Sequence, residues 1–146
     1  MGNEQYKLDT SDSAMTFEFT SEGPKGQIPK IIRYTEVGIS NFYNLGFGDR
    51  IGDTKDFDDK VVSDNKDSLK VLSTVVESVS IFTDVYPEAF VFATGSTPAR
   101  TRLYQIGISN NLEEILEHFQ VLGMKNNAWE KFEKNQNYVA FLITRK

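Results

Sequence analysis

The feature that most constrains the fold of this chain is one long amphipathic pattern that a proline ends. Apolar residues recur at spacings of three and four between residues 69 and 86, and the stripe consists of Leu69, Leu72, Val75, Val76, Val79, Phe82 and Tyr86. This pattern predicts a helix that starts at Ser63 or Asp64, either of which can cap it, and runs to about Tyr86 before Pro87. Only one face of that helix is apolar, so other parts of the chain must cover it.

Strand patterns lie on the N-terminal side of this helix. From Met15 apolar and polar residues alternate, and further strands are predicted at 30–35 and 42–47. Gly and Pro between residues 23 and 26 indicate a turn, and the short connections favour an antiparallel meander. Residues 1–14 are polar, and we expect a flexible segment there ahead of a single domain over residues 15–146.

The segments after the helix mix strands with two more helices. The apolar run 89–93 predicts a central strand, and Thr97 and Pro98 then open a helix that Gly107 interrupts. Asn110 and Glu113 form a capping box for a third helix that ends near Phe119. Three strands end the chain, and we expect 134–136 to join the last two as a hairpin; they are 120–122, 129–133 and 137–144.

This order of elements predicts the fold class. Strands gather at both ends of the chain around a helical middle, in the order βββ-α-β-αα-βββ. That arrangement favours an α+β fold with a mostly antiparallel sheet and the helices packed on one face.

Charge and composition exclude several classes of protein. Cysteine is absent, which rules out disulfide frameworks and thiol chemistry. The net charge is −5, and residues 1–67 hold thirteen acids against eight bases, so nucleic acid is a possible but not a favoured partner. No signal peptide pattern and no apolar run of about 18 residues is present. We therefore expect a cytoplasmic protein without membrane contact.

The segment from Gly95 to Tyr104 is the main candidate for a binding site. A strand that feeds a turn of small residues and a helix N-terminus presents backbone N–H groups to an anion. Ser96 and Thr97 add hydroxyl groups, and Arg100 on the first helical turn can grip a phosphate or carboxylate. Arg102 lies on another side of the helix, while Tyr104 shares the face of Arg100. A purely structural role is the alternative, with Thr97 as cap and Arg100 paired with an acid.

At this junction the chain resembles a bacterial family known only as a domain of unknown function. The signature is Gly-Ser-Thr-Pro-Ala-Arg-Thr-Arg-Leu-Tyr-Gln at 95–105, and stretches at 17–26, 43–49, 67–75 and 129–134 also match. The resemblance covers nearly the whole chain. Gly46 and Lys66 depart from it, where Ala and Gly are expected. Because that family has no established activity, the resemblance implies an identity and no mechanism.

The acidic loop 49–59 is a weaker candidate, as a metal site. Asp56, Asp58 and Asp59 carry the oxygen ligands that Mg²⁺ and Ca²⁺ prefer, but the EF-hand spacing fails. Lysines interleave with these acids, as on a solvated surface, so we expect no metal and no cofactor. His118 is the only histidine and lies near a predicted helix C-terminus, where its partial charge is favourable without catalysis.

Four aromatic residues near the C-terminus have two interpretations. Trp129, Phe132, Tyr138 and Phe141 are expected mostly in the core. The alternative is an exposed aromatic surface for a partner or for single-stranded bases.

The hypothesis that these patterns favour is a small soluble interaction domain, not an enzyme, with an anion-binding site at residues 95–102. A protein partner or a homodimer is expected, since an edge strand such as 30–35 needs cover. One alternative is a metal-dependent phosphodiesterase or nuclease-like toxin, with Arg100 and Arg102 beside the acidic loop. Another is an acidic antitoxin-like or phage accessory protein that masks a basic partner.

Overall fold

The alternation of apolar residues along the strands gives each strand one face toward a shared core. The computed structural model describes residues 4–60 and 63–146. Within these residues nine strands form one sheet, in the order β1-β2-β3-β4-β6-β9-β7-β8, with β5 paired to β4. Their bounds are β1 Asp9–Thr10, β2 Thr16–Gly23, β3 Gly26–Glu36, β4 Phe42–Arg50, β5 Phe57–Asp58, β6 Phe90–Ala93, β7 Phe119–Lys125, β8 Ala128–Lys131 and β9 Ala140–Arg145.

The sheet is mostly antiparallel, as predicted, and the fold is α+β. The exception is the pair of β4 and β6, which run parallel in a register that aligns Phe42 with Phe90 and Leu45 with Ala93. A parallel neighbour needs a long crossover, and α1 supplies it. The observed order has two short strands, β1 and β5, that the predicted order βββ-α-β-αα-βββ lacks.

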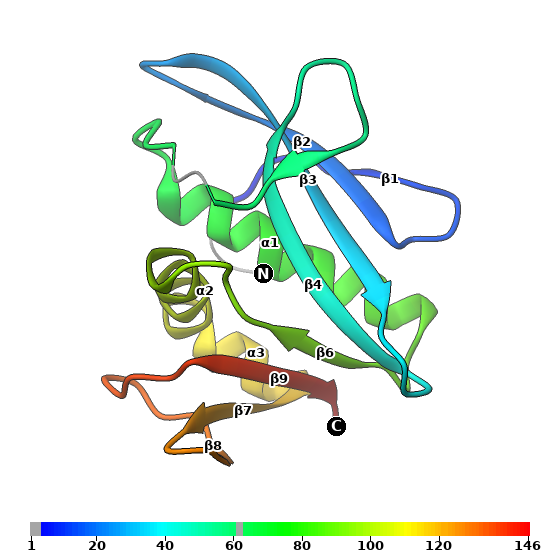
Figure 1. Cartoon of the computed structure of the whole chain (residues 1–146), viewed down its shortest axis with the longest axis vertical. Helices are drawn as coiled ribbons and strands as arrows, with labels where there is room; N and C mark the ends of the chain where they lie inside the picture. The colour runs from blue at the N-terminus through cyan, green and yellow to red at the C-terminus, as the bar shows by residue number, and fades with distance from the viewer. Residues whose placement is uncertain (1–3, 61–62) are drawn as a thin grey trace.

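Three helices supply the apolar side chains that meet the inner face of the sheet. They are α1 Ser68–Val85, α2 Pro98–Asn110 and α3 Leu112–His118. Figure 1 shows α1 behind β2, β3 and β4, and α3 behind β9 and β7. Residues from all three helices belong to one buried cluster with the inward residues of the strands. Phe82 of α1, fully buried, stacks on Tyr34 of β3 with ring centroids 4.1 Å apart.

The predicted start of α1 at Ser63 or Asp64 is wrong. The helix begins at Ser68, with Asp67 at the N-cap position but no hydrogen bond from its side chain to the helix. Lys66 has a φ of 62°, a left-handed conformation that no α-helix continues through. The side chain of Asn65 is buried and donates hydrogen bonds to the β2–β3 hairpin. The residues just before α1 therefore make tertiary contacts and do not form a helical turn.

Two predicted helix boundaries are also wrong. Gly107 does not interrupt α2, which continues to Asn110. A Cβ at Gly107 would lie 3.1 Å from Cβ of Leu72, so the glycine permits close packing of α2 on α1. The N-cap of α3 is Asn111, which makes no side-chain cap bond, so Asn110 and Glu113 form no capping box.

The hairpin predicted at 134–136 is wrong, because β8 pairs with β7 and β9 lies between β6 and β7. The turn lies at Asn126 and Asn127, both with positive φ, which suits the right-handed twist of a two-residue hairpin. The segment 30–35 is not an edge either. It lies within β3, which β2 and β4 flank, so the argument for a homodimer from that edge no longer holds.

The described part of the N-terminal segment lies against the domain. The backbone N–H of Tyr6 donates to Oγ1 of Thr74 over 2.8 Å, and its hydroxyl donates to the carboxylate of Asp67 over 2.6 Å. Residues Asp9 and Thr10 pair with β2. The predicted flexibility of residues 1–14 stays a prediction, and residues 1–3 lie outside the described part of the chain.

Candidate functional site

The connection from β6 to α2 forms the candidate site, as the sequence predicts, and its backbone path depends on Gly95. A Cβ at Gly95 would lie 2.3 Å from the backbone nitrogen of Thr101 and 2.5 Å from Cβ of Arg100. No other residue fits so near the first turn of α2. The N–H of Gly95 donates to Oγ1 of Thr101 over 2.9 Å, which holds the turn against the helix.

The first turn of α2 is capped by Thr97. Its side chain accepts the backbone N–H of Arg100 at 3.2 Å, and Pro98 occupies the first helical position. The hydroxyl of Ser96 donates to the carbonyl of Asp59 over 2.7 Å, which ties the turn to the acidic loop. Within the described residues, the N–H of Ala99 has no hydrogen-bond acceptor. It therefore remains one of the unsatisfied donors that make a helix N-terminus attractive to anions.

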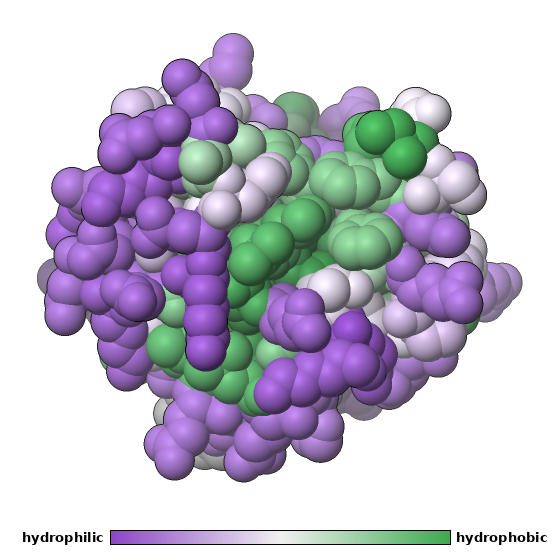
Figure 2. Space-filling view, turned by 90° about the horizontal axis from the view of Figure 1, so that it is seen from below, coloured by the Kyte–Doolittle hydropathy of each residue, from purple (hydrophilic) through white to green (hydrophobic). Residues whose placement is uncertain are grey.

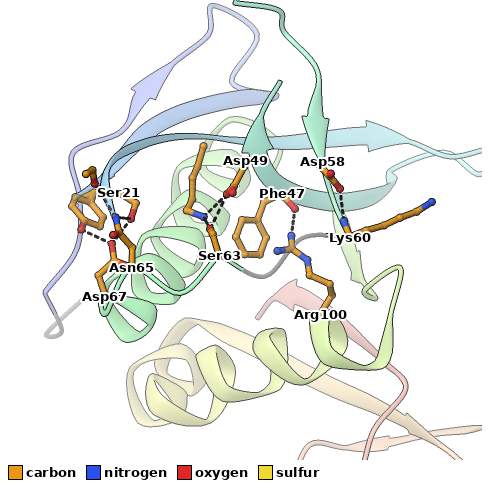
Figure 3. Close-up of polar contacts among 12 residues, drawn as sticks. Ser21, Phe47, Asp49, Asp58, Lys60, Ser63, Asn65, Asp67 and Arg100 are labelled. Carbon is orange, nitrogen blue, oxygen red and sulfur yellow. Dashed lines mark hydrogen bonds and ion pairs between the residues drawn. The ribbon is translucent and has the colours of Figure 1, made fainter. Parts of the chain in front are cut away.

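Arg100 extends into the interior and away from this surface. Only 3% of the residue is exposed, and its guanidinium donates to the carbonyl of Phe47 on β4. The guanidinium carbon lies 4.3 Å from the centroid of the Phe47 ring, a cation–π contact. Figure 3 shows the side chain directed from α2 toward β4. Arg100 therefore holds α2 on the sheet.

Tyr104 follows Arg100 into the interior, as the spacing of four residues predicts. Its ring meets the Phe47 ring edge-on with centroids 5.6 Å apart. Burial raises the pKa of Tyr104 to about 12, although the nearby charge of Arg100 opposes the shift. The phenol thus stays neutral at any physiological pH and contributes packing.

Arg102 points the other way and is exposed. It lines an open hollow of about 540 Å³ at the N-terminus of α2, together with Ser96, Thr97, Ala99 and Gln105 from the helix side. The opposite wall comes from residues 137–139. A second hollow of about 540 Å³ continues along α2 and shares Arg102, Gln105 and Asn137. Arg102 makes no ion pair or hydrogen bond with any part of the chain that the structure describes.

The structure therefore divides the five predicted site residues into two groups. Ser96, Thr97 and Arg102 lie at the hollow, whereas Arg100 and Tyr104 are buried behind the helix. The sequence indicates this division, because Arg102 is about 200° around the helix from Arg100. The sequence did not predict that residues 135–139 line these hollows. Their position beside α2 depends on the path of the chain between β8 and β9.

A buried polar cluster lies beside Arg100, between β3, β4 and the start of α1 (Figure 3). Lys30, only 5% exposed, donates from Nζ to the carboxylate of Asp49 over 2.5 Å and to Ser63 Oγ over 3.0 Å. On its other side Asp67 accepts from Ser21 Oγ over 2.5 Å. The space between these groups and Arg100 is only about 30 Å³, room for a water molecule or two and not for a larger ligand.

The acidic loop gathers no metal site in the described residues. No group of three or more His, Asp or Glu side chains lies close enough to hold an ion there. Asp58 accepts the backbone N–H of Lys60 at 2.9 Å, and the Asp59 carbonyl accepts from Ser96. Within the described residues, Asp56, Asp58 and Asp59 therefore do not form the carboxylate cluster that the nuclease hypothesis requires for its metal.

The four C-terminal aromatic residues divide between core and surface. Phe132, Tyr138 and Phe141 are buried, and their rings contact one another. Trp129 is 37% exposed on β8. His118 ends α3, as predicted, with its side chain exposed.

These features define an α+β domain with a polar groove along its second helix. The groove consists of the two hollows that share Arg102, Gln105 and Asn137. Comparison with protein families matches residues 2–146 to a family of unknown function, DUF6934, and the chain belongs to this family. Neither the curated proteins nor the solved structures contain a match. Within the described residues, no helix is long and apolar enough to span a membrane.

Proposed function

We propose that this chain is a small binding domain that receives an anionic group, phosphate or carboxylate, at the N-terminus of α2. The observation that carries the proposal is the side chain of Arg102. It is exposed, lacks an acidic partner in the described chain, and lines an open hollow beside the unsatisfied N–H of Ala99. A guanidinium and a helix N-terminus that face one space both favour a negative charge there.

The charge of the groove walls supports the proposal. Acids make up 21 of the 146 residues, yet the described residues that line the two hollows include neither Asp nor Glu. The walls carry instead side-chain amides and hydroxyls, which are Ser96, Thr97, Gln105, Ser109, Asn110, Asn135, Gln136 and Asn137. In a chain of net charge −5, such a surface has the sign that an anion needs.

Arg100 has a positioning role in this proposal. Its bond to the Phe47 carbonyl fixes the rotation of α2, and that rotation directs Arg102 outward. The phosphodiesterase alternative needs acids beside the arginines and gains no support from this arrangement.

The test is a titration of the isotopically labelled protein with inorganic phosphate, followed by amide NMR. We expect saturable shifts at Ser96–Ala99, and loss of these shifts in Arg102→Gln. Lys25→Gln, which removes the same charge from the exposed β2–β3 turn, is the matched control and should leave them intact. Shifts that persist in Arg102→Gln, or that sodium chloride reproduces, would overturn the proposal.

A further inference from the structure

The groove along α2 is longer than a single anion requires. Each of its two hollows has a volume of about 540 Å³, and on the helix side the lining reaches from Ala99 to Asn110. At the rise of an α-helix this stretch is about 16 Å long, which is also the length of about five residues of an extended chain. Phosphate at the N-terminus of α2 would leave the second hollow, which reaches Asn110, without a ligand.

The charge of the groove suits a ligand with a single negative charge. Among the described residues that line the two hollows, Arg102 is the only one with a charged side chain. One guanidinium matches one carboxylate, with two parallel hydrogen bonds. A polyanion would bring further negative charges to a chain whose net charge is already −5. We therefore expect the rest of the ligand to be neutral.

The second hollow offers hydrogen-bonding groups that the protein itself does not use. The side chains of Ser109, Asn135 and Asn137 line it and make no hydrogen bond within residues 4–60 and 63–146. A hydroxyl or a side-chain amide can both donate and accept a hydrogen bond. Both functions are needed to bind a peptide main chain, because each of its residues carries an N–H donor and a C=O acceptor.

The groove already contains one contact between a side-chain amide and a main chain. Gln105 donates from Nε2 to the carbonyl of Gln136, and its Oε1 accepts the backbone N–H of Tyr138 at 3.4 Å. These bonds hold the wall formed by residues 136–138 to α2. Asn137 lies between the two bonded residues and lines both hollows with its side chain unpaired in the described chain. It can therefore bond a second main chain that lies beside this wall.

The remaining side chains of the groove favour a peptide over a nucleotide. Tyr138 is the only aromatic residue among the described lining residues, and it is buried, so a base finds no exposed ring for stacking. Ile106, 38% exposed, and Val139, 62% exposed, offer one apolar contact in each hollow for side chains of a peptide. Figure 2 shows hydrophobic side chains gathered on the side of β7 and β9, whereas the groove lining is mostly polar. That polarity favours an extended main chain over the apolar side of a helix.

We infer that the groove binds the C-terminal end of an extended, uncharged peptide. This ligand occupies the anion site proposed above, on which the inference rests. The terminal carboxylate lies between Arg102 and the N-terminus of α2, and the preceding residues follow the helix toward Asn110 with their main chain against Asn137. Capture of a terminal carboxylate by backbone N–H groups is one of the recurring modes of peptide recognition.

The probe is a pool of N-acetylated pentapeptides, randomised among uncharged residues, with a free terminal carboxylate. Amide NMR should show saturable shifts at Ser96–Ala99 and also at Ser109 and residues 135–137, whereas inorganic phosphate should shift only Ser96–Ala99. The same pool with a terminal carboxamide should bind about tenfold more weakly, because it loses the charged hydrogen bonds to Arg102. Arg102→Gln should remove the shifts that phosphate causes and weaken the carboxylate pool to the level of the carboxamide pool.

Ser109→Ala distinguishes the peptide from a simple anion, because Ser109 lines only the second hollow. It should weaken the carboxylate pool about fivefold, the loss of one hydrogen bond, and leave the phosphate shifts unchanged. Asn137→Ala should weaken the peptides by a similar factor. Ser80→Ala, which removes a half-buried hydroxyl from α1, is the matched control and should change neither titration.

The failure of this inference and that of the proposed function give different results. Phosphate shifts without peptide shifts at Ser109 and residues 135–137 would overturn the inference alone. Equal binding of the carboxylate and carboxamide pools would do the same. Absence of phosphate shifts at Ser96–Ala99 in the unsubstituted protein would overturn the proposed function, and the inference with it.

Discussion

The guanidinium of Arg100 lies over the ring of Phe47, 4.3 Å from its centroid, and donates a hydrogen bond to the carbonyl of the same residue. One residue of β4 thus holds one residue of α2 by two contacts. Because helical side chains two positions apart point in nearly opposite directions, burial of Arg100 places Arg102 at the surface. The candidate anion site therefore depends on an interior contact that touches no ligand.

Loss of this contact should cost stability. Arg100→Ala leaves the Phe47 carbonyl without its donor in a buried setting, and we expect a loss of about 3 kcal/mol in the free energy of unfolding. Arg102→Ala removes the same charge from an exposed position and should change stability by less than about 0.5 kcal/mol. Urea unfolding of both variants checks the difference. Equal losses would contradict the inward and outward assignments.

Two glycines of the chain should respond differently to alanine. Gly95→Ala places a methyl group 2.3 Å from the backbone of Thr101, and relief requires α2 to move, so we expect a loss above about 2 kcal/mol. Gly46→Ala meets only the far edge of the Phe57 ring at 3.2 Å, on a short strand that can shift. It should change stability by less than about 1 kcal/mol. Melting temperatures compare the two, and a larger loss at Gly46 would refute the reasoning.

Much of the fold follows from local patterns. The stripe from Leu69 to Tyr86 predicts most of α1, and the run 89–93 predicts β6, because periodicity and capping act within one element. The misplaced elements depend on contacts between distant residues. Asn65 bonds to the β2–β3 hairpin and not to a helix, and β9 enters between β6 and β7. No local pattern carries that information.

The same distinction applies to the site. The helix N-terminus and its cap at Thr97 were predictable, since a threonine followed by a proline is typical of the N-cap and first position of a helix. The wall formed by residues 135–139 was not. An exposed position for Trp129 was only the alternative interpretation, and the contacts of Phe42 with Phe90 and Phe92 form only across strands. Alternation within 42–47 shows which residues share a side but not which side is covered.

Asn65 should prove one of the most sensitive polar residues. It is 1% exposed, donates to Ser21 Oγ and the Gly26 carbonyl, and accepts the N–H of Lys25 at 2.7 Å. Asn65→Ala removes all three bonds, and a loss of about 3 kcal/mol is expected. Asp64→Ala, at an exposed neighbour, should cost less than about 1 kcal/mol. Chemical denaturation measures both, and a mild effect at Asn65 would argue against a buried cluster.

Stability should fall at alkaline pH through Tyr104. Burial raises its pKa from 10.0 to about 12 in the folded chain. The neutral phenol is therefore favoured by folding, and this contribution is complete below about pH 10 and is lost as the pH rises through about 12. In that window one such group changes the free energy of unfolding by about 1.4 kcal/mol per pH unit. Tyr104→Phe should show a shallower decline in alkaline denaturation, and an unchanged slope would contradict the assignment.

The most direct test of the anion site is a crystal grown with tungstate, an oxyanion that anomalous scattering locates. The account predicts an anomalous peak in the hollow between the guanidinium of Arg102 and the N–H of Ala99, and none there in crystals of Arg102→Gln. An empty hollow in the unsubstituted protein, with tungstate bound only elsewhere, would contradict the central claim.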